Sequence, residues 1–267
     1  ARPHELSLST RHERYSLSMC GRIVQATSPE EIAREFGASI ETASFGGDWE
    51  PRWNLAPTSR ALIVAPLDAT GATRSVAQAR WGLVPHWAKD ETLGNRLFNA
   101  RAETVERLPS FRDAFKSGRV LVPIDAFYEW ENPEHLEALG RPLPPKSPKQ
   151  PWAFLPARGG RFALAGLSTT RTQPDGRALR TFTLITTEAN AVIGSIHDRM
   201  PVMLDDADER AAWLDTRTPI SAIRALLGPA PDALIAPRRV SRAVSNARNE
   251  GVRLLDAVPD SGIGLGL

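Results

Sequence analysis

Several chemical features are scarce or missing in this sequence, and each absence excludes a class of protein. Cys20 is the one cysteine among 267 residues, so it has no disulfide partner within the chain and cannot belong to a multi-cysteine metal site. No stretch approaches the roughly 18 consecutive apolar residues that cross a membrane. Internal repeats, a P-loop and a Gly-x-Gly-x-x-Gly motif are also missing. We therefore expect a cytoplasmic protein that is neither disulfide-stapled nor membrane-bound and that uses no metal or cofactor.

A strong excess of one charge is missing too. The formal net charge at pH 7 is only +2, because 33 Lys and Arg residues are nearly balanced by 31 Asp and Glu residues. The overall charge therefore does not demonstrate nucleic-acid binding, and any basic surface must be local. Hydrophobic residues make up 42% of the chain, which is ordinary for a soluble globular protein with a substantial core.

The expected elements are mostly strands. A helix is predicted from Ser28 as N-cap, with Pro29 at its first position, Glu31 completing a capping box and Gly37 ending it. Further helices are expected at 110–116, capped by Ser110, at 188–195, at 206–214, and at 219–227, capped by Thr218. Strands are expected at 61–65, 73–81, 119–124, 127–130, 152–155, 162–167 and 181–186, with residues 41–60 irregular. Because strands outnumber helices without regular βαβ alternation, we expect a single α+β domain whose largely antiparallel sheets form a barrel-like core with peripheral helices.

Two segments differ from the rest. Residues 1–18 are polar and show no helical or strand period, so we expect a disordered extension or a mis-assigned start before a domain at 19–260. Residues 132–150 are rich in proline and polar groups and are expected to form a surface loop insertion. Because this loop carries no candidate site residue, we expect it to be dispensable for the chemistry.

Cys20 directly follows Met19, the first methionine of the chain. In a protein that starts at Met19, methionine removal would make Cys20 the N-terminus, with a thiol and a free α-amine on adjacent carbons. Their reference pKa values are about 8.5 and about 7.7–8.0, so both nucleophiles are partly available near neutrality. Such a 1,2-aminothiol can capture an aldehyde, first as a Schiff base and then as a five-membered thiazolidine. In the chain as written Cys20 has an amide nitrogen and cannot form that ring; the alternative is a lone cysteine buried as a small apolar residue.

Two residues are candidates for proton transfer. Of the five histidines, only His86 and His197 lie in segments expected to be ordered. His197 stands beside an aspartate and an arginine in an expected loop, which favours a general acid or base over a packing role. Glu129 lies within the apolar strand 126–130, where a buried carboxylate would have a raised pKa suited to proton transfer. The alternative for Glu129 is a solvent-facing side chain on a half-exposed sheet.

Other residues are candidates for contacts with a nucleic acid. Asn99 and Arg101 are two residues apart, so both side chains face one side of an extended chain. Arg101 can clamp a phosphate in bidentate fashion, or it can pair with Glu103. Trp87 is either a core residue or a platform on which a nucleobase stacks.

Six motifs occur in a fixed order along the chain. They are Met-Cys-Gly-Arg at 19–22, Asn-Leu-Ala-Pro at 54–57, Trp-Gly-Leu-Val-Pro-His-Trp at 81–87, Asn-Ala-Arg-Ala-Glu at 99–103, Phe-Tyr-Glu-Trp at 127–130 and Ile-His-Asp-Arg-Met-Pro at 196–201. From Met19 to about residue 257 the chain resembles the SRAP family, the SOS-response-associated peptidase proteins. The resemblance implies a sensor of abasic sites in single-stranded DNA. Such a sensor crosslinks its N-terminal cysteine to the sugar aldehyde as a thiazolidine and shields the lesion from strand cleavage.

The resemblance also implies a role for each motif residue. Cys20 would form the crosslink, Glu129 and His197 would move the protons, and Asn99 would hold the opened sugar. Phosphates near the lesion would be bound by three arginines, Arg22, Arg101 and Arg199. Flanking bases would pack against Pro57 and Trp87, and Asn54 is counted with them among the DNA-binding residues. The implied partner is single-stranded DNA containing abasic sites, and the implied state is a monomer.

Two other functions remain open from the residues. One is a cysteine peptidase with Cys20 as nucleophile and His197 as base, in a narrow form that only cleaves the chain before Cys20. The other is a reader of single-stranded DNA or of a modified base that binds without a covalent bond, in which Cys20 is incidental.

Overall fold

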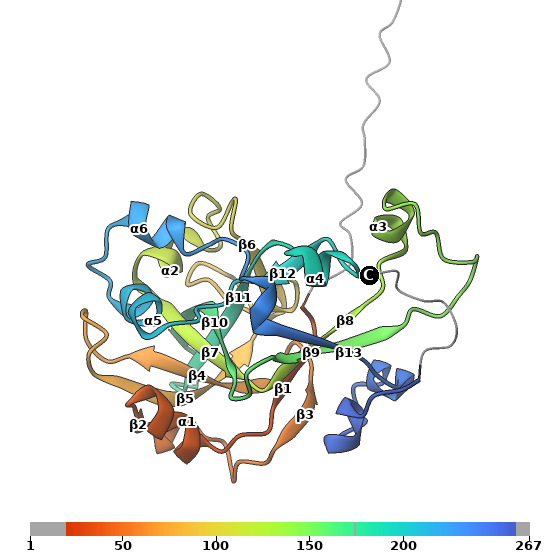
Figure 1. The fold of residues 1–267 in the computed structure, drawn as a ribbon. Helices are drawn as coiled ribbons and strands as arrows, with labels where there is room; N and C mark the ends of the chain where they lie inside the picture. Colours follow the sequence, from red (N-terminus) through yellow and green to blue (C-terminus); the bar gives the residue numbers. More distant parts are fainter. Residues whose placement is uncertain (1–19, 174, 260–267) are drawn as a thin grey trace, which may run out of the picture.

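A closed ring of five strands forms the centre of the molecule (Figure 1). The computed structural model describes residues 20–173 and 175–259. Antiparallel pairing joins the ring strands in the order β11, β10, β7, β4, β5, and a parallel pairing of β11 with β5 closes it. These strands are β4 (Arg60–Pro66), β5 (Arg74–Trp81), β7 (Arg119–Ile124), β10 (Phe162–Thr172) and β11 (Ala178–Glu188). The expected α+β domain with a barrel-like, largely antiparallel core is confirmed.

Two short strands flank β11 where it leaves the ring. β6 (Asn99–Arg101) pairs with it in parallel, and β12 (Arg199–Pro201) pairs with it in antiparallel orientation. Thr186 of β11 is opposite both Arg101 and Pro201. Motif segments that lie about 100 residues apart in the sequence are therefore brought to one end of one strand. A third short strand, β2 (Ser39–Ile40), pairs with the far side of β5.

A second sheet of five strands is antiparallel throughout. Its strand order is β13, β9, β8, β1, β3, and the strands are β1 (Ile23–Gln25), β3 (Arg52–Leu55), β8 (Ala126–Trp130), β9 (Pro151–Pro156) and β13 (Ile235–Arg239). One residue, Asp125, separates β7 of the ring from β8 of this sheet. Phe127 and Phe154 stack with their ring centroids 4.9 Å apart, in a buried cluster that also contains ring residues such as Phe162 and Leu164. This shared core joins the ring to the second sheet.

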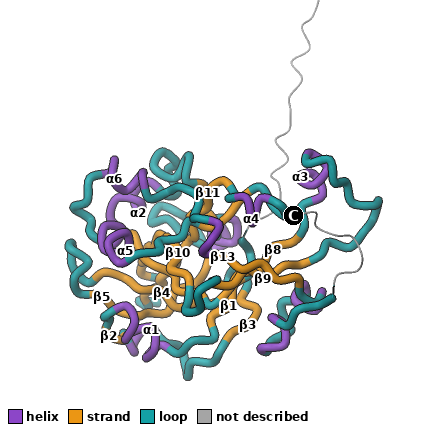
Figure 2. The backbone as a smooth tube through the Cα atoms, viewed as in Figure 1, coloured by secondary structure: helices purple, strands orange, loops and turns teal. Residues whose placement is uncertain are grey.

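Helices cover the outside of the ring. α2, α5 and α6 gather on one side of the barrel strands (Figures 1 and 2), where Phe115, Trp213 and Ile223 pack in one cluster with Leu121 of β7. The six α-helices among the described residues are α1 (Pro29–Phe36), α2 (Arg112–Ser117), α3 (Pro133–Ala138), α4 (Ala191–Gly194), α5 (Ala207–Leu214) and α6 (Ile220–Ala225). Short 3-10 turns are η1 (Thr42–Ser44), η2 (Glu91–Arg96), η3 (Asp232–Leu234), η4 (Arg242–Ser245) and η5 (Val252–Leu255).

The expected helix after Ser28 is confirmed in detail. The Ser28 side chain accepts from the Glu31 backbone nitrogen, the Glu31 carboxylate accepts from that of Ser28, and Gly37 ends the helix with a φ of 57°. This capping box depends on neighbouring residues alone, which is why the sequence reveals it.

Three local expectations differ from the structure. α2 starts at Arg112 after an uncapped Phe111, since the preceding turn continues into the helix through the bond from the Arg112 nitrogen to the Leu108 carbonyl. α6 has Pro219 as its N-cap, without a side-chain cap from Thr218. Residues 41–60, expected to be irregular, contain β3, and the loop insertion at 132–150 contains the short helix α3. The extension expected at 1–18 lies outside the described residues.

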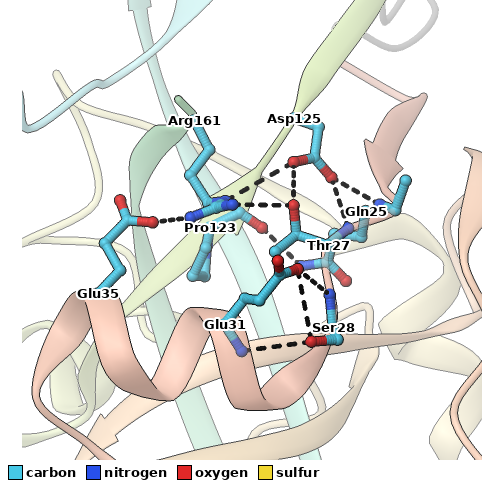
Figure 3. Close-up of polar contacts among 9 residues, drawn as sticks. Gln25, Thr27, Ser28, Glu31, Glu35, Pro123, Asp125 and Arg161 are labelled. Atoms are coloured by element: carbon cyan, nitrogen blue, oxygen red, sulfur yellow. Dashed lines mark hydrogen bonds and ion pairs between the residues drawn. The ribbon is translucent and has the colours of Figure 1, made fainter. Parts of the chain in front are cut away.

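A polar network fixes β1 at the point where the chain passes from β7 to β8 (Figure 3). The Asp125 carboxylate accepts the backbone N–H groups of Ala26 (2.6 Å) and Thr27 (3.0 Å) and the Thr27 hydroxyl (2.6 Å). The Gln25 side chain, 2% exposed, donates to the carbonyls of Leu62 (2.8 Å) and Pro123 (2.7 Å) and accepts from the Leu62 nitrogen.

The same network reaches α1 through Arg161, which is shown with its partners in Figure 3. Its guanidinium forms an ion pair with Glu35 and donates to the Thr27 hydroxyl at 3.0 Å. Because buried polar groups are costly unless paired, this set of bonds holds β1 in a single register beside β8. The residues just before β1 are thereby held beside the far end of β8.

Candidate functional site

The register of β1 and β8 places Cys20 beside Glu129. Ile23 is opposite Phe127, and the Tyr128 nitrogen donates to the Arg22 carbonyl at 2.9 Å. Following these antiparallel strands, the residues before Ile23 approach those after Phe127, and the Cys20 backbone nitrogen donates a short hydrogen bond to Glu129 Oε1. Cys20 is fully buried and has a φ of 41°, in the left-handed region where a non-glycine residue is strained. The solvent-facing alternative for Glu129 is wrong, because the residue is only 3% exposed.

Burial keeps both of these groups protonated near neutral pH. Burial raises the pKa of Glu129 to about 8, against the lowering effect of the bond from the Cys20 nitrogen. Burial, followed by the neighbouring Glu129 charge, also raises the pKa of the Cys20 thiol well above its usual range. The thiol forms no hydrogen bond to any residue in the part of the chain that the structure describes. A carboxylic acid that retains its proton at pH 7 can act as a general acid.

His197 lies in the loop between α4 and β12 and is 6% exposed. Its Nδ1 is 3.0 Å from Asp198 Oδ1 and 3.3 Å from the Arg199 backbone nitrogen. Burial lowers its pKa, the Asp198 carboxylate opposes that shift, and the neighbouring His135, Lys149 and Arg199 reinforce it. His197 is therefore neutral near pH 7 and suited to accept a proton.

The two acid–base groups share one electrostatic environment. Asp198 raises the pKa of both Glu129 and His197, and Lys149 lowers both. Near neutrality the Glu129 carboxyl group keeps its proton because burial raises its pKa, and the His197 imidazole is neutral because burial lowers its pKa further. Glu129 is thus a proton donor in contact with the Cys20 nitrogen, and His197 is a proton acceptor that shares the neighbouring charges of Asp198 and Lys149.

Arg199 is held by a carboxylate from the turn that follows β6. Its guanidinium forms two bonds to Glu103, one of them at 3.0 Å from Nη2 to Oε2, and donates to the Thr186 carbonyl at 2.8 Å. The side chain is 14% exposed. The alternative in which Glu103 pairs with Arg101 is wrong, because Arg199 takes that position. Arg101 itself is exposed, and Asn99 is half-buried at the start of β6.

Asn54 and Arg22 anchor the C-terminal segment to the site. Asn54 is fully buried, and its Nδ2 lies within hydrogen-bond distance of the carbonyls of Val244 (3.2 Å), Asn246 (3.0 Å) and Asn249 (3.0 Å). Its Oδ1 accepts from Arg22 at 2.8 Å, and the same Arg22 nitrogen donates to the Val244 carbonyl at 2.8 Å. A direct DNA contact by the Asn54 side chain would require these bonds to break. The geometry therefore indicates that Asn54 holds residues 244–249 and Arg22 in place.

The aromatic residues of the motifs divide into buried and exposed ones. Trp81 is fully buried, and its Nε1 donates to the Phe98 carbonyl at 2.8 Å. Trp87 is 50% exposed, so the alternative of a core residue is wrong for it. Trp130 is half-buried, with the Arg22 guanidinium 5.5 Å from its ring centroid. Pro57 is half-buried in the turn between β3 and β4.

Some residues of the site were not expected from the sequence. Lys149 and His135 belong to the loop that was expected to be dispensable, and no motif or local pattern points to them. Thr186 accepts a hydrogen bond from Arg199 through its backbone carbonyl. Every residue has such a carbonyl, so the residue type does not predict this contact. Asp198 lies inside the motif at 196–201, so the sequence shows that it is next to His197. The sequence does not show that Asp198 also raises the pKa of Glu129.

The described part of the chain holds no group of three or more His, Cys, Asp or Glu residues arranged to bind a metal ion. Within the same ranges, none of the helices is both long enough and apolar enough to span a membrane.

Comparison with known proteins identifies relatives along almost the whole chain. The family model for SOS response associated peptidase (SRAP) matches residues 19–247. The chain is 35% identical over 240 residues to the abasic site processing protein YoqW of Bacillus subtilis, covering 90% of this chain and all of that protein. It is 28% identical to the abasic site processing protein YedK of Escherichia coli, again covering 90% of this chain and all of the relative. Identity is 26% to HMCES of Xenopus tropicalis, an abasic site processing protein of which 78% is covered.

Solved structures share the fold. A protein from Bacteroides thetaiotaomicron superimposes with a TM-score of 0.75 at 20% identity, covering 90% of this chain and all of the other. A phage-related protein from Bordetella bronchiseptica gives a TM-score of 0.59 at 27% identity, covering 84% of this chain and 95% of the other. Both structures cover most of this chain as one domain.

Proposed function

Because the chain belongs to the SOS response associated peptidase (SRAP) family, we propose that it processes abasic sites in single-stranded DNA by bonding Cys20 to the opened sugar. The observation that carries the proposal is the Cys20 nitrogen hydrogen-bonded to a buried, protonated Glu129. The printed names of its relatives, abasic site processing proteins, support the substrate. The reaction requires a free amine at Cys20, so we expect the reacting form of the protein to begin at this residue.

The reaction proceeds in three steps that the site residues can serve. His197, which is neutral near pH 7, accepts the proton of the anomeric hydroxyl and returns it to the ring oxygen as the sugar ring opens to the aldehyde. The Cys20 amine adds to the aldehyde carbon, Glu129 protonates the resulting hydroxyl, which leaves as water, and the iminium ion returns its N–H proton to Glu129 to give the Schiff base. The thiol then adds across the carbon–nitrogen double bond, sulfur to carbon and hydrogen to nitrogen, and closes the thiazolidine. Asn99, at the start of β6, would hold the opened sugar.

DNA binding is assigned to motif residues other than the reacting ones, of which Arg101 and Trp87 are exposed. Arg101 is exposed, so its guanidinium can bind a phosphate directly. Arg199 can bind one by exchanging part of its ion pair with Glu103. Bases on either side of the lesion would stack on Trp87 and pack against Pro57. Arg22 would reach a phosphate from its position over Trp130, and Asn54 would act indirectly by holding Arg22 and residues 244–249 in place.

The test compares three proteins with an oligonucleotide that contains one abasic site. Protein that starts at Cys20 should give an adduct that survives denaturation, with the mass of a thiazolidine. Cys20→Ala should give no such adduct, and protein retaining residues 1–19 should bind the strand without forming the ring. A thiazolidine at Cys20 in protein that still carries Ala1 would overturn the mechanism.

Self-cleavage before Cys20 is a second candidate, favoured by the strained φ of 41° at the scissile position. The thiol would attack the Met19 carbonyl and shift the acyl group from nitrogen to sulfur, and water would then release the acid and the free amine. A peptidase that cleaves other chains is disfavoured, because Cys20 is fully buried and closed to a second peptide. Intact mass should show conversion of purified long protein to the form starting at Cys20, and Cys20→Ser should slow it. If the long form keeps its mass indefinitely, self-cleavage does not occur.

A further inference from the structure

The segment leading into His197 is held by the region that joins β8 to β9. α4 ends at Gly194, so the carbonyls that follow have no partner in a next helical turn. The Gly194 carbonyl accepts from His135 Nε2 at 2.6 Å, and the Ser195 carbonyl accepts from Arg141 Nη1 at 3.1 Å. The Ile196 carbonyl accepts from the Asn132 backbone nitrogen at 3.1 Å. Three consecutive carbonyls directly before His197 are thus satisfied by a single stretch of ten residues.

The fold of this stretch explains how it supplies all three donors. The Asn132 side chain caps α3 by accepting from the backbone nitrogens of Glu134 and His135. Leu136 is buried at 2% exposure and ties the helix to the protein, and the Arg141 nitrogen bonds back to the Leu136 carbonyl at 2.8 Å. The chain therefore turns back on itself after one helical turn and brings both ends of α3 to α4. Figure 1 shows α3 and α4 at the same end of the molecule.

The same region acts on the acid–base pair through charge. His135 and Lys149 both lower the pKa of His197, and Lys149 also lowers that of Glu129. The other charged groups that act on His197 are Asp198 and Arg199. The loop that joins β8 to β9 is therefore close to the reacting groups and not a remote appendage.

We propose that residues 132–141 position His197 for proton transfer, with His135 and Arg141 as positioning residues that act through the Gly194 and Ser195 carbonyls. The proposal rests on the proposed function for the reaction that His197 serves. It revises the expectation that the insertion is dispensable. Misplacing a reacting group by about 1 Å can cost about 10²-fold in rate, so losing one of three bonds to the preceding backbone has a measurable effect on the reaction.

The experiment uses protein starting at Cys20 and compares four variants in single-turnover crosslinking to an abasic-site oligonucleotide. His135→Ala should slow the reaction about 10-fold or more, while binding to the same strand without a lesion stays within about 2-fold. His135→Gln keeps a donor at a similar distance and should restore most of the rate. Glu137→Ala, on the same helix and without a side-chain bond, is the matched control and should react like wild type. Arg141→Ala should also slow the reaction, which covers the case in which His135→Ala folds poorly.

A second readout does not depend on DNA. The pKa of His197, followed by NMR titration of its ring, should move from its lowered value toward the ordinary value of about 6.5 in His135→Ala. Glu137→Ala should leave it unchanged. Wild-type rates in both His135→Ala and Arg141→Ala would overturn the positioning role, as would equal slowing by His135→Ala and His135→Gln. If wild-type protein forms no adduct at all, the proposed function fails, and the NMR comparison still decides the positioning.

Discussion

Replacing Glu129 with glutamine removes a titrating proton from the buried site while keeping a side chain of nearly the same shape. The carboxyl accepts the Cys20 N–H and is 3% exposed. A glutamine carbonyl can accept the same hydrogen bond from the Cys20 nitrogen. The variant therefore removes the titrating proton and leaves the packing of the side chain nearly unchanged. The perturbation therefore tests whether Glu129 is held as a neutral acid.

The sign and size of the effect follow from the pKa. Burial raises it from an ordinary 4.5 to about 8, so between these values the folded protein binds more protons than the unfolded chain. Stability contributed by this group is complete below about pH 4.5 and is lost as the pH rises through about 8. At about 1.36 kcal/mol per pKa unit, the full loss is on the order of 5 kcal/mol. Glu129→Gln has no such titration, so its advantage over wild type grows with pH.

Urea unfolding from about pH 5.5 to 8.5 measures this difference. His197 titrates in the same range with a lowered pKa, but it is present in both proteins and cancels in the comparison. In protein that starts at Cys20, the terminal ammonium would favour the charged form of Glu129 and lower its pKa. The difference in stability between wild type and Glu129→Gln would then be smaller. The crosslinking rate of Glu129→Gln should fall by about 10²–10⁴-fold, as for the loss of a general acid. Parallel stability curves for wild type and variant would refute the buried, protonated Glu129.

Three further predictions concern other parts of the structure. Asp125→Ala leaves the N–H groups of Ala26 and Thr27 without their acceptor and should lower the free energy of unfolding by about 2 kcal/mol in urea titrations; an unchanged midpoint would contradict the role of the network. Arg119 is fully buried and donates to four carbonyls, including those of Trp213 and Asp215, so Arg119→Met should cost about 3 kcal/mol or more by the same measurement. Arg101→Ala should weaken binding to single-stranded DNA and reduce its salt dependence by about one phosphate contact, and an unchanged salt slope would show that Arg101 does not reach the backbone.

Local patterns made part of this protein readable without its structure. The helix after Ser28 depends on a capping box and a terminal glycine within ten residues, and the strands expected at 61–65 and 73–81 correspond to β4 and β5. The aminothiol chemistry of Cys20 also follows from composition and position. The six motifs indicated the family because all of them occur in this chain in the same order as in the family. None of these inferences needs knowledge of which distant residues meet.

Contacts between distant residues decided the rest. Glu129 lies on a strand with both faces buried, whereas the alternation of residues in a strand cannot tell a covered outer face from an exposed one. Arg199 pairs with Glu103 rather than leaving that carboxylate to Arg101, because β6 and β12 flank the same end of β11. His135 meets Gly194 across 59 positions. A sequence states which groups can donate, accept or titrate, but burial and long-range pairing set their partners and pKa values, and these exist only once the chain has folded.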